Sequence, residues 1–185
     1  MINERIVSKT SRFLILILRH KPEGINIQLD EHGWVNTEQL IKKSNEYGHN
    51  LTMDILEYIV ETNDKKRFAF NDDKTKIRAS QGHSVDIELG YTPKTPPTIL
   101  YHGTGLKSVF SIQKFGIEKR SRTHVHLSSD IETAITVGKR HGNLVVFEVQ
   151  ALKMHCVGYK FFLSDNGVWL TDWIPVPYIR LLPSC

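Results

Sequence analysis

The first half of the chain spaces its apolar residues as short helices do. Apolar positions from Ile6 to Leu18 recur every three or four residues and predict one helix, which ends before Pro22 and Gly24. Two further helices are indicated by residues that commonly cap helix starts. These are Asn36 with Gln39 three positions later, and Thr52 ahead of the apolar face at 55–60.

Two short strands follow these helices, at 67–70 and 76–78, with a polar turn at 71–75 between them. Three helices and a β-hairpin are the pattern of a winged helix. The stretch 90–97 holds three of the seven prolines, and nothing periodic can continue through it. We therefore expect a first domain at 1–90, a Pro-rich linker at 91–97 and a second domain at 98–185.

The second half alternates short strands with helices, so the predicted fold class of the whole chain is α+β. Asn166-Gly167 is a strong hairpin signal, because this pair tolerates the positive φ that tight turns need. Strands are expected at 99–101, 125–127, 144–149, 161–163, 168–170 and 178–182, and helices around 106–115 and 130–140.

Composition narrows the function classes. With 40% hydrophobic residues and a net charge of only +4, the chain is not disordered. Its two cysteines exclude a disulfide scaffold and a Cys-rich zinc module. The longest apolar run, 13–18, is too short to span a bilayer, and charged residues close it where a signal peptidase would cut. We expect a soluble, reduced, cytoplasmic protein without a membrane partner, whose mild positive charge permits an anionic ligand.

Known nucleotide motifs are absent, including the P-loop and the Gly-x-Gly-x-x-Gly fingerprint. What stands out instead is a series of polar residues that directly follow apolar segments. They are Arg19-His20, Arg67, Gln81-Gly82-His83-Ser84, His102-Gly103-Thr104-Gly105, His124 with His126, and Arg140-His141-Gly142.

Each of these residues also has an ordinary structural interpretation. Arg19 and Arg140 could simply face the negative ends of helix dipoles, and Arg67 could be a solvated strand charge or a nucleic-acid contact. The residues from His102 to Gly105 could be a turn that ends a strand. His124 and His126 share one strand face, yet no Cys, Asp or Glu stands at a spacing that completes a zinc ligand set, so no metal is expected.

The order of these segments resembles the RNA 2′-phosphotransferase family, called Tpt1 in fungi and KptA in bacteria. The resemblance runs from about residue 9 to residue 182. It rests on these segments in this order: Leu18-Arg19-His20-Lys21-Pro22, Gly33-Trp34-Val35, Lys66-Arg67-Phe68, Ile77–Ser84, Tyr101-His102-Gly103-Thr104, His124–Ser128 and Gly138–Gly142.

The resemblance implies a winged-helix N-terminal lobe, an ADP-ribosyltransferase-like C-terminal lobe and an active site in the cleft between them. It also implies a reaction that consumes NAD⁺ as co-substrate. An internal 2′-phosphate of a spliced, tRNA-like RNA displaces nicotinamide, and the ribose O2″ then attacks that phosphate. The products are 2′-OH RNA and ADP-ribose 1″,2″-cyclic phosphate.

The resemblance also assigns residues. The family's catalytic Arg-His-Arg-Arg tetrad maps onto Arg19, His20, Arg67 and Arg140. NAD-binding residues are expected at His102, Gly103, Thr104, His126 and Ser128, with Gly103 admitting close backbone approach to the nicotinamide amide. Arginine suits the phosphate because its planar, permanently charged fork can hold two oxygens, and histidine suits the proton transfer of the second step. We expect a monomer.

Two alternatives stay open at this point. One is an ADP-ribosyltransferase that stops after the first step and caps phosphorylated nucleic-acid ends. The other is a non-enzymatic winged-helix protein that binds nucleic acid. Against the second, the predicted third helix, 53–62, carries Asp54, Glu57 and Glu61 and no basic residue, whereas a groove-reading helix should be basic.

Overall fold

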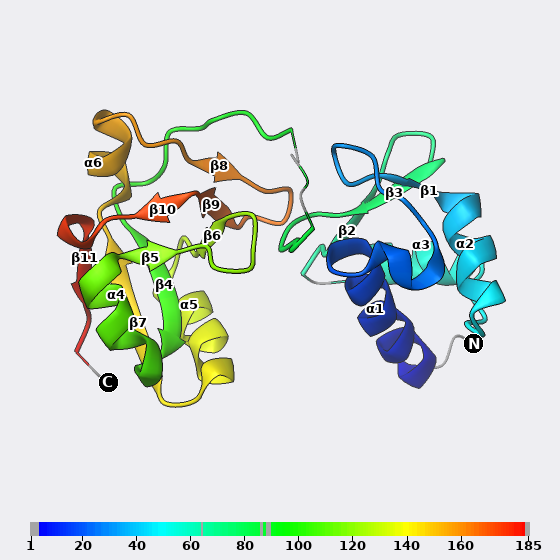
Figure 1. Ribbon diagram of the computed structural model, residues 1–185, viewed down its shortest axis with the longest axis horizontal. Coiled ribbons are helices and arrows are strands. Elements are labelled where there is room, and N and C mark those ends of the chain that lie inside the picture. Colours follow the sequence, from blue (N-terminus) through cyan, green and yellow to red (C-terminus); the bar gives the residue numbers. More distant parts are fainter. Residues whose placement is uncertain (1–3, 64, 86, 88–89, 184–185) are drawn as a thin grey trace. The chain divides into compact units, whose positions relative to one another are not determined.

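The computed structural model describes residues 4–63, 65–85, 87 and 90–183. Within it the chain divides into two compact units, Met1–Gly90 and Tyr91–Cys185. Both units mix helices with small antiparallel sheets (Figure 1), so the fold is of the α+β class.

Side-chain caps mark the starts of two helices in the first unit. They are α1 (Glu4–Arg19), the 3₁₀ turn η1 (Pro22–Ile25), α2 (Thr37–Glu46) and α3 (Met53–Glu61). The Asn36 side chain accepts a hydrogen bond from Gln39 N, and the Thr52 side chain accepts one from Ile55 N. Both predicted N-caps are confirmed, since each satisfies a backbone N–H that the first helical turn leaves without a partner.

The sheet of the first unit has the order β1-β3-β2, with β1 (Val35–Asn36), β2 (Phe68–Phe70) and β3 (Lys76–Ala79) antiparallel. The predicted hairpin is therefore confirmed, and the short strand β1 joins it. Helices and sheet enclose one core, which includes Leu14, Leu18, Leu40, Leu56 and Ile77. Burial of such side chains is the main source of stability in a unit of this size.

The described residues of the second unit form three small antiparallel sheets, whose strands are labelled in Figure 1. The first has the order β11-β7-β4, from β11 (Ile179–Leu181), β7 (Leu144–Val149) and β4 (Leu100–Gly105). The second has the order β6-β9-β8, from β6 (Val125–Leu127), β9 (Trp169–Thr171) and β8 (Phe162–Leu163). The third pairs β10 (Trp173–Ile174) with β5 (Ile117–Glu118).

Short helices connect these strands: η2 (Leu106–Ser108), α4 (Val109–Phe115), α5 (Ile131–Gly138), η3 (Lys139–His141), α6 (Ala151–Cys156) and η4 (Val176–Tyr178). The Asp130 side chain caps α5 by accepting a hydrogen bond from Thr133 N at 2.7 Å. The core of this unit includes Leu100, Leu127, Phe147, Met154 and Phe161. It forms a separate cluster from the core of the first unit.

Close packing of α5 against β4 explains one glycine of the second unit. A Cβ atom added to Gly103 would lie 1.8 Å from the carbonyl oxygen of Ala134 in α5. No side chain fits at that distance, so the glycine lets the helix backbone approach the strand. This is the observed reason for a glycine here, whereas an approach to the nicotinamide amide stays a prediction.

One sequence interpretation was wrong in its local structure. The residues from His102 to Gly105 are not a turn after a strand, because β4 continues through them and pairs with β7 up to Gly105 and Leu144. The strand continues because its hydrogen-bond partner, β7, is six residues long. The two-residue strands β1, β5 and β10 and the helix α6 were not predicted, since elements this short carry no periodic signal.

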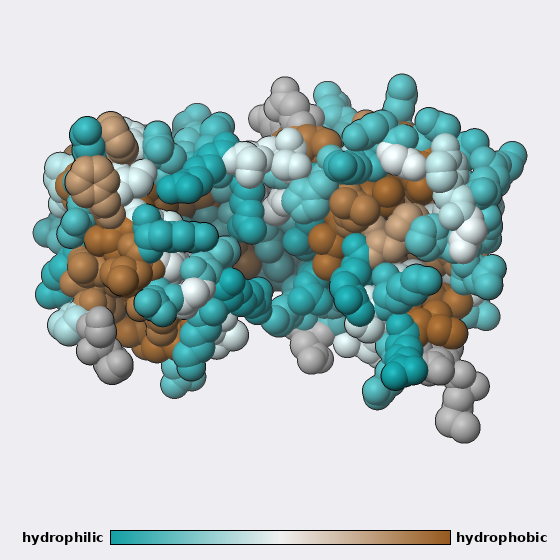
Figure 2. Space-filling view, turned by 60° about the horizontal axis from the view of Figure 1, so that its bottom comes forward, coloured by the Kyte–Doolittle hydropathy of each residue, from teal (hydrophilic) through white to brown (hydrophobic). Residues whose placement is uncertain are grey.

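Apolar side chains also reach the surface of both units, visible as brown patches in Figure 2. Within the described residues, no helix combines the length and the apolar character that a membrane span requires.

Candidate active site

Arg19 and His20 lie at the C-terminal end of α1, and Arg67 directly precedes β2. The structure brings these residues together. Ser80 N donates to the carbonyl oxygen of Arg67 at 2.9 Å, and Arg19 Nη2 makes a longer contact of 3.5 Å with the same oxygen. Residues 48 positions apart therefore meet at one end of the sheet in the first unit.

The segment from Gly82 to Ser84 also contacts the end of α1. Ser84 N donates to the Arg19 carbonyl oxygen at 2.9 Å, and Ser84 Oγ lies 2.9 Å from His20 Nδ1. A Cβ atom added to Gly82 would lie 3.2 Å from Arg19 Nη1, so the glycine leaves room for the guanidinium. Gly82 also has φ +86°, a conformation that glycine adopts without strain.

His83 lies between Gly82 and Ser84 in the chain and is fully buried, with a relative exposure of 0%. Neither ring nitrogen has a hydrogen-bond partner among the described residues. Burial lowers the pKa of His83 to about 4, and the positive charges of Arg19, His20 and Arg78 add to the effect. The ring is therefore neutral at physiological pH and adds no further charge beside Arg19 and Arg78.

The Arg67 side chain has a partner that the sequence did not reveal. Its Nη1 donates to Asn63 Oδ1 at 3.4 Å. Asn63 carried no signal in the sequence because it lies in a polar loop after α3. Ser84 was visible only as part of the Gln-Gly-His-Ser segment and was not assigned to the site.

In the second unit, a two-way backbone bridge aligns β4 with the end of β6. Tyr101 N donates to Ser128 O at 2.9 Å, and Ser128 N donates to Tyr101 O at 2.9 Å. This bridge places His102 and His126 on neighbouring segments. Of the predicted NAD-binding residues, His102, His126 and Ser128 are thereby brought together, and Gly103 and Thr104 follow His102 along β4.

His102 is held in one tautomer. Its Nδ1–H donates to the carbonyl oxygen of His126 at 3.1 Å, so Nε2 is the acceptor in the neutral ring. Burial lowers the pKa of His102, and His141, Arg122 and Arg120 lower it further, while the bond to His126 acts in the opposite direction. A neutral His102 can therefore accept a hydrogen bond from a ligand hydroxyl.

His126 contacts a basic residue rather than a metal-ligand set. Arg122 Nη1 donates to His126 Nδ1 at 3.3 Å, and Arg122 was not among the predicted site residues. The neighbouring His124 packs its ring against Phe162, with 5.7 Å between the ring centroids. Across the part of the chain that the structure describes, no group of three or more His, Cys, Asp or Glu could hold a metal ion.

Arg140 belongs to η3, the 3₁₀ turn that follows α5, and its side chain is exposed. The turn itself packs closely on β4, because a Cβ atom added to Gly105 would lie 2.3 Å from the carbonyl oxygen of His141. Thr104, between the two close-packed glycines, is buried with 8% exposure. The structure thus fixes the backbone at Arg140 relative to the strand that carries His102.

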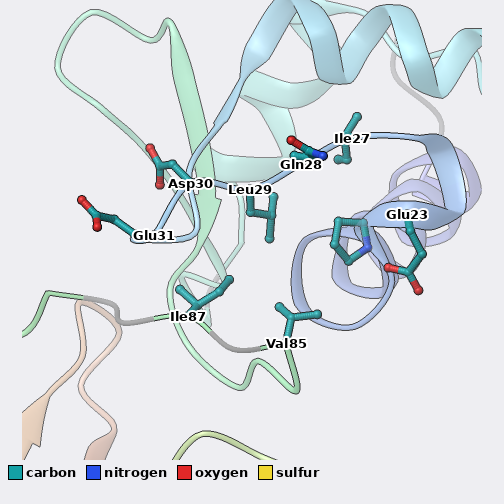
Figure 3. A pocket seen from close by; sticks show the side chains of 9 residues that line it. Glu23, Ile27, Gln28, Leu29, Asp30, Glu31, Val85 and Ile87 are labelled. Carbon is teal, nitrogen blue, oxygen red and sulfur yellow. The ribbon is translucent and has the colours of Figure 1, made fainter.

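A hollow of about 390 Å³ also lies in the first unit (Figure 3). Leu29, Val85 and Ile87 point into it, whereas Asp30 and Glu31 point away. None of the predicted site residues lines it. Asp30 instead accepts hydrogen bonds from His32 N and Trp34 N and pairs with Lys76 Nζ at 3.2 Å, so this carboxylate stabilises the turn at 30–34.

Comparison with known proteins gives a consistent result. The model of the family described as "RNA 2'-phosphotransferase, Tpt1 / KptA family" matches residues 4–173. A protein of Flavobacterium johnsoniae named "Probable RNA 2'-phosphotransferase" is 52% identical over 96% of this chain and 98% of its own length. A protein of the same name from Fusobacterium nucleatum is 53% identical over 93% of this chain and 97% of its own length.

A third relative with that name, from Trichormus variabilis, is 49% identical over 94% of this chain and 96% of its own length. The match therefore covers both units rather than a shared single domain. The chain belongs to the RNA 2′-phosphotransferase (Tpt1/KptA) family and is a transferase enzyme.

Proposed function

We propose that this enzyme removes an internal 2′-phosphate from RNA and consumes NAD⁺ as its co-substrate. An oxygen of the 2′-phosphate attacks C1″ of the nicotinamide ribose of NAD⁺ and displaces nicotinamide. The ribose O2″ then attacks phosphorus, the bond to the RNA O2′ breaks, and the proton of O2″ ends on O2′. The products are 2′-OH RNA and ADP-ribose 1″,2″-cyclic phosphate.

The observation that carries this proposal is that Arg19 contacts the backbone carbonyl of Arg67, with His20 next to Arg19 at the end of α1 and bonded to Ser84. A 2′-phosphate monoester carries about −1.5 to −2 charges near neutrality and three acceptor oxygens. It is already a nucleophile, so the first step needs positioning rather than a general base. Two guanidinium groups supply this, because each can hold two oxygens.

The second step makes different demands. A ribose hydroxyl must lose its proton while negative charge grows on the phosphoryl oxygens. We assign the proton transfer or its hydrogen bond to His20 and the stabilisation of charge to Arg140. Arg140 is exposed, so its guanidinium is accessible to a ligand.

The NAD⁺ site is assigned to His102, Gly103, Thr104, His126 and Ser128 of the second unit. His102 supports this assignment, because its neutral ring presents Nε2 as an acceptor to a ribose hydroxyl. Arg122, bonded to His126, adds a positive charge suited to a pyrophosphate. The residues present thus fit the ligand without a metal ion, and we propose that none is used.

We also propose that the first unit is a winged-helix lobe and the second an ADP-ribosyltransferase-like lobe. The order of α1, α2, α3 and the β2–β3 hairpin supports the first identification. The third helix, α3, carries Asp54, Glu57 and Glu61 and no basic residue, which favours a scaffold over a groove reader.

The test is to incubate the enzyme with NAD⁺ and a short RNA that bears one internal 2′-phosphate, and to identify products by mass. We expect nicotinamide, 2′-OH RNA and the cyclic phosphate in equal amounts, with or without EDTA. The same RNA without the phosphate is the substrate control. Arg12→Ala, an exposed arginine on α1, is the matched protein control for Arg19 variants.

Three outcomes would contradict the proposal. ADP-ribosylated RNA as the final product would favour an enzyme that caps phosphorylated nucleic-acid ends. RNA binding without loss of NAD⁺ would favour a non-enzymatic role. Activity that disappears in EDTA and returns with a divalent ion would overturn the metal-free reaction.

A further inference from the structure

Ser84 makes two different contacts with the end of α1. Its backbone N–H donates to the carbonyl oxygen of Arg19, and its hydroxyl lies 2.9 Å from Nδ1 of His20. The backbone contact satisfies a carbonyl at the helix C-terminus, where intrahelical partners are missing. Any residue except proline could make that bond, so the hydroxyl is not needed to end the helix.

The segment that carries Ser84 is itself firmly held. On one side of Ser84, the fully buried His83 anchors the backbone in the unit. One residue further, Gly82 adopts φ +86° against the Arg19 guanidinium. The Ser84 hydroxyl is therefore presented from a fixed backbone to His20, an exposed residue at the end of α1.

A hydroxyl is well suited to hold an imidazole that changes its protonation state. It accepts a hydrogen bond from Nδ1–H in the charged ring, and it can donate one to Nδ1 in the neutral ring. Ser84 can stay bonded to Nδ1 throughout the reaction. Exchange of protons or hydrogen bonds with a substrate then runs through Nε2.

We propose that Ser84 is a positioning residue, which fixes the ring of His20 through Nδ1 so that Nε2 meets the 2′-phosphate or the attacking ribose hydroxyl. This inference rests on the proposed function, because it concerns the second step of that reaction. Ser84 itself touches neither reacting group. Its effect on the rate passes through His20 alone.

The test compares Ser84→Ala with Ser84→Thr. Alanine removes the hydroxyl and keeps the backbone bond to Arg19. Threonine keeps the hydroxyl, and its extra methyl group is tolerated because residue 84 is exposed. Ser8→Ala is the matched control, since Ser8 is also exposed and its hydroxyl also has a side-chain partner, Arg12.

Two readouts are needed. The first is the ¹⁵N NMR spectrum of the His20 ring without substrate, which reports the hydrogen bond at Nδ1 whatever the enzyme does. The second is a time course with radiolabelled RNA, which separates the two chemical steps. We expect Ser84→Ala to shift the Nδ1 signal and to slow the second step about tenfold or more, comparable to the loss of a partner that orients a metal-bound histidine. The variant should build up ADP-ribosylated RNA, and Ser84→Thr should restore both readouts.

Several results would overturn the proposal. A slower second step with an unchanged His20 spectrum would mean that Ser84 acts by another route. A shifted spectrum with a normal second step would mean that the contact does not matter for the reaction. If wild-type enzyme leaves NAD⁺ intact, the proposed function fails, and the His20 spectra of Ser84→Ala and Ser84→Thr still decide whether the hydroxyl holds the ring.

Discussion

The buried ring of His83 should make the free energy of unfolding depend on pH. Burial lowers the pKa of His83 from 6.5 to about 4 in the folded protein, with Arg19, His20 and Arg78 contributing in the same direction. In the unfolded chain the ring regains its ordinary pKa. Between these two values the unfolded state binds the proton more readily, so acid favours unfolding.

The size of this effect follows from the shift. Each pKa unit corresponds to about 1.36 kcal/mol, so the shift to about 4 corresponds to about 3 kcal/mol. This contribution is fully present above pH 6.5 and is lost progressively as the pH falls towards 4. Against a total stability of roughly 5–15 kcal/mol for a typical domain, the loss should be easy to measure.

The assay is urea unfolding of the wild type and of His83→Leu at several pH values from 7.5 to 4. Leucine cannot titrate, and it replaces a ring whose nitrogens have no partner among the described residues, so its cost at pH 7 should be small. Burial also lowers the pKa of His49, His102 and His124, but these residues contribute equally to both proteins. We expect the wild type to lose about 3 kcal/mol more than the variant over this range. Parallel curves for the two proteins would refute a buried, neutral His83.

Three further predictions concern the site. Gly103→Ala should prevent normal packing of α5, because the added Cβ would lie 1.8 Å from the Ala134 carbonyl oxygen. A thermal melt should then show little folded protein, and a normal melt would show that the helix can shift. Arg19→Ala should lower the rate of RNA dephosphorylation about 10²-fold. Arg19→Lys should recover only part of that rate, since lysine keeps the charge and loses the planar guanidinium that can hold two oxygens. A wild-type rate in the lysine variant would show that charge alone suffices. His20→Ala and Arg140→Ala should accumulate ADP-ribosylated RNA in a time course, because the roles assigned to His20 and Arg140 belong to the second step. Slow loss of substrate without this intermediate would contradict that assignment.

Elements with strong local signals could be predicted from the sequence. The side chains of Asn36, Thr52 and Asp130 each accept a hydrogen bond from a backbone N–H three residues later, a contact that depends only on nearby residues. The hairpin at Asn166-Gly167 could be predicted for the same reason, and its two strands pair with Phe162 opposite Leu170. These features need no knowledge of the rest of the fold.

Features that depend on distant partners could not be predicted in the same way. β4 extends to Gly105 because β7 lies beside it for six residues, and nothing within residues 102–105 indicates this. The bond between Ser84 and His20 joins residues 64 positions apart. The order of segments identified the candidate residues, while the roles of Arg19, His20, Arg67 and Arg140 stay predictions for the experiments above.

Glycine illustrates how one residue type carries different information at different positions. Gly103 permits the close approach of a helix backbone, and Gly82 combines a positive φ with space for the Arg19 guanidinium. Gly103 is itself assigned to the NAD⁺ site and Gly82 stands beside Arg19, so replacing either would alter the site and the packing together. Ser84→Ala avoids this difficulty, because the change removes one exposed hydroxyl and leaves the backbone bond to Arg19 in place. It is therefore the variant in which a loss of activity can be traced to the orientation of a single ring.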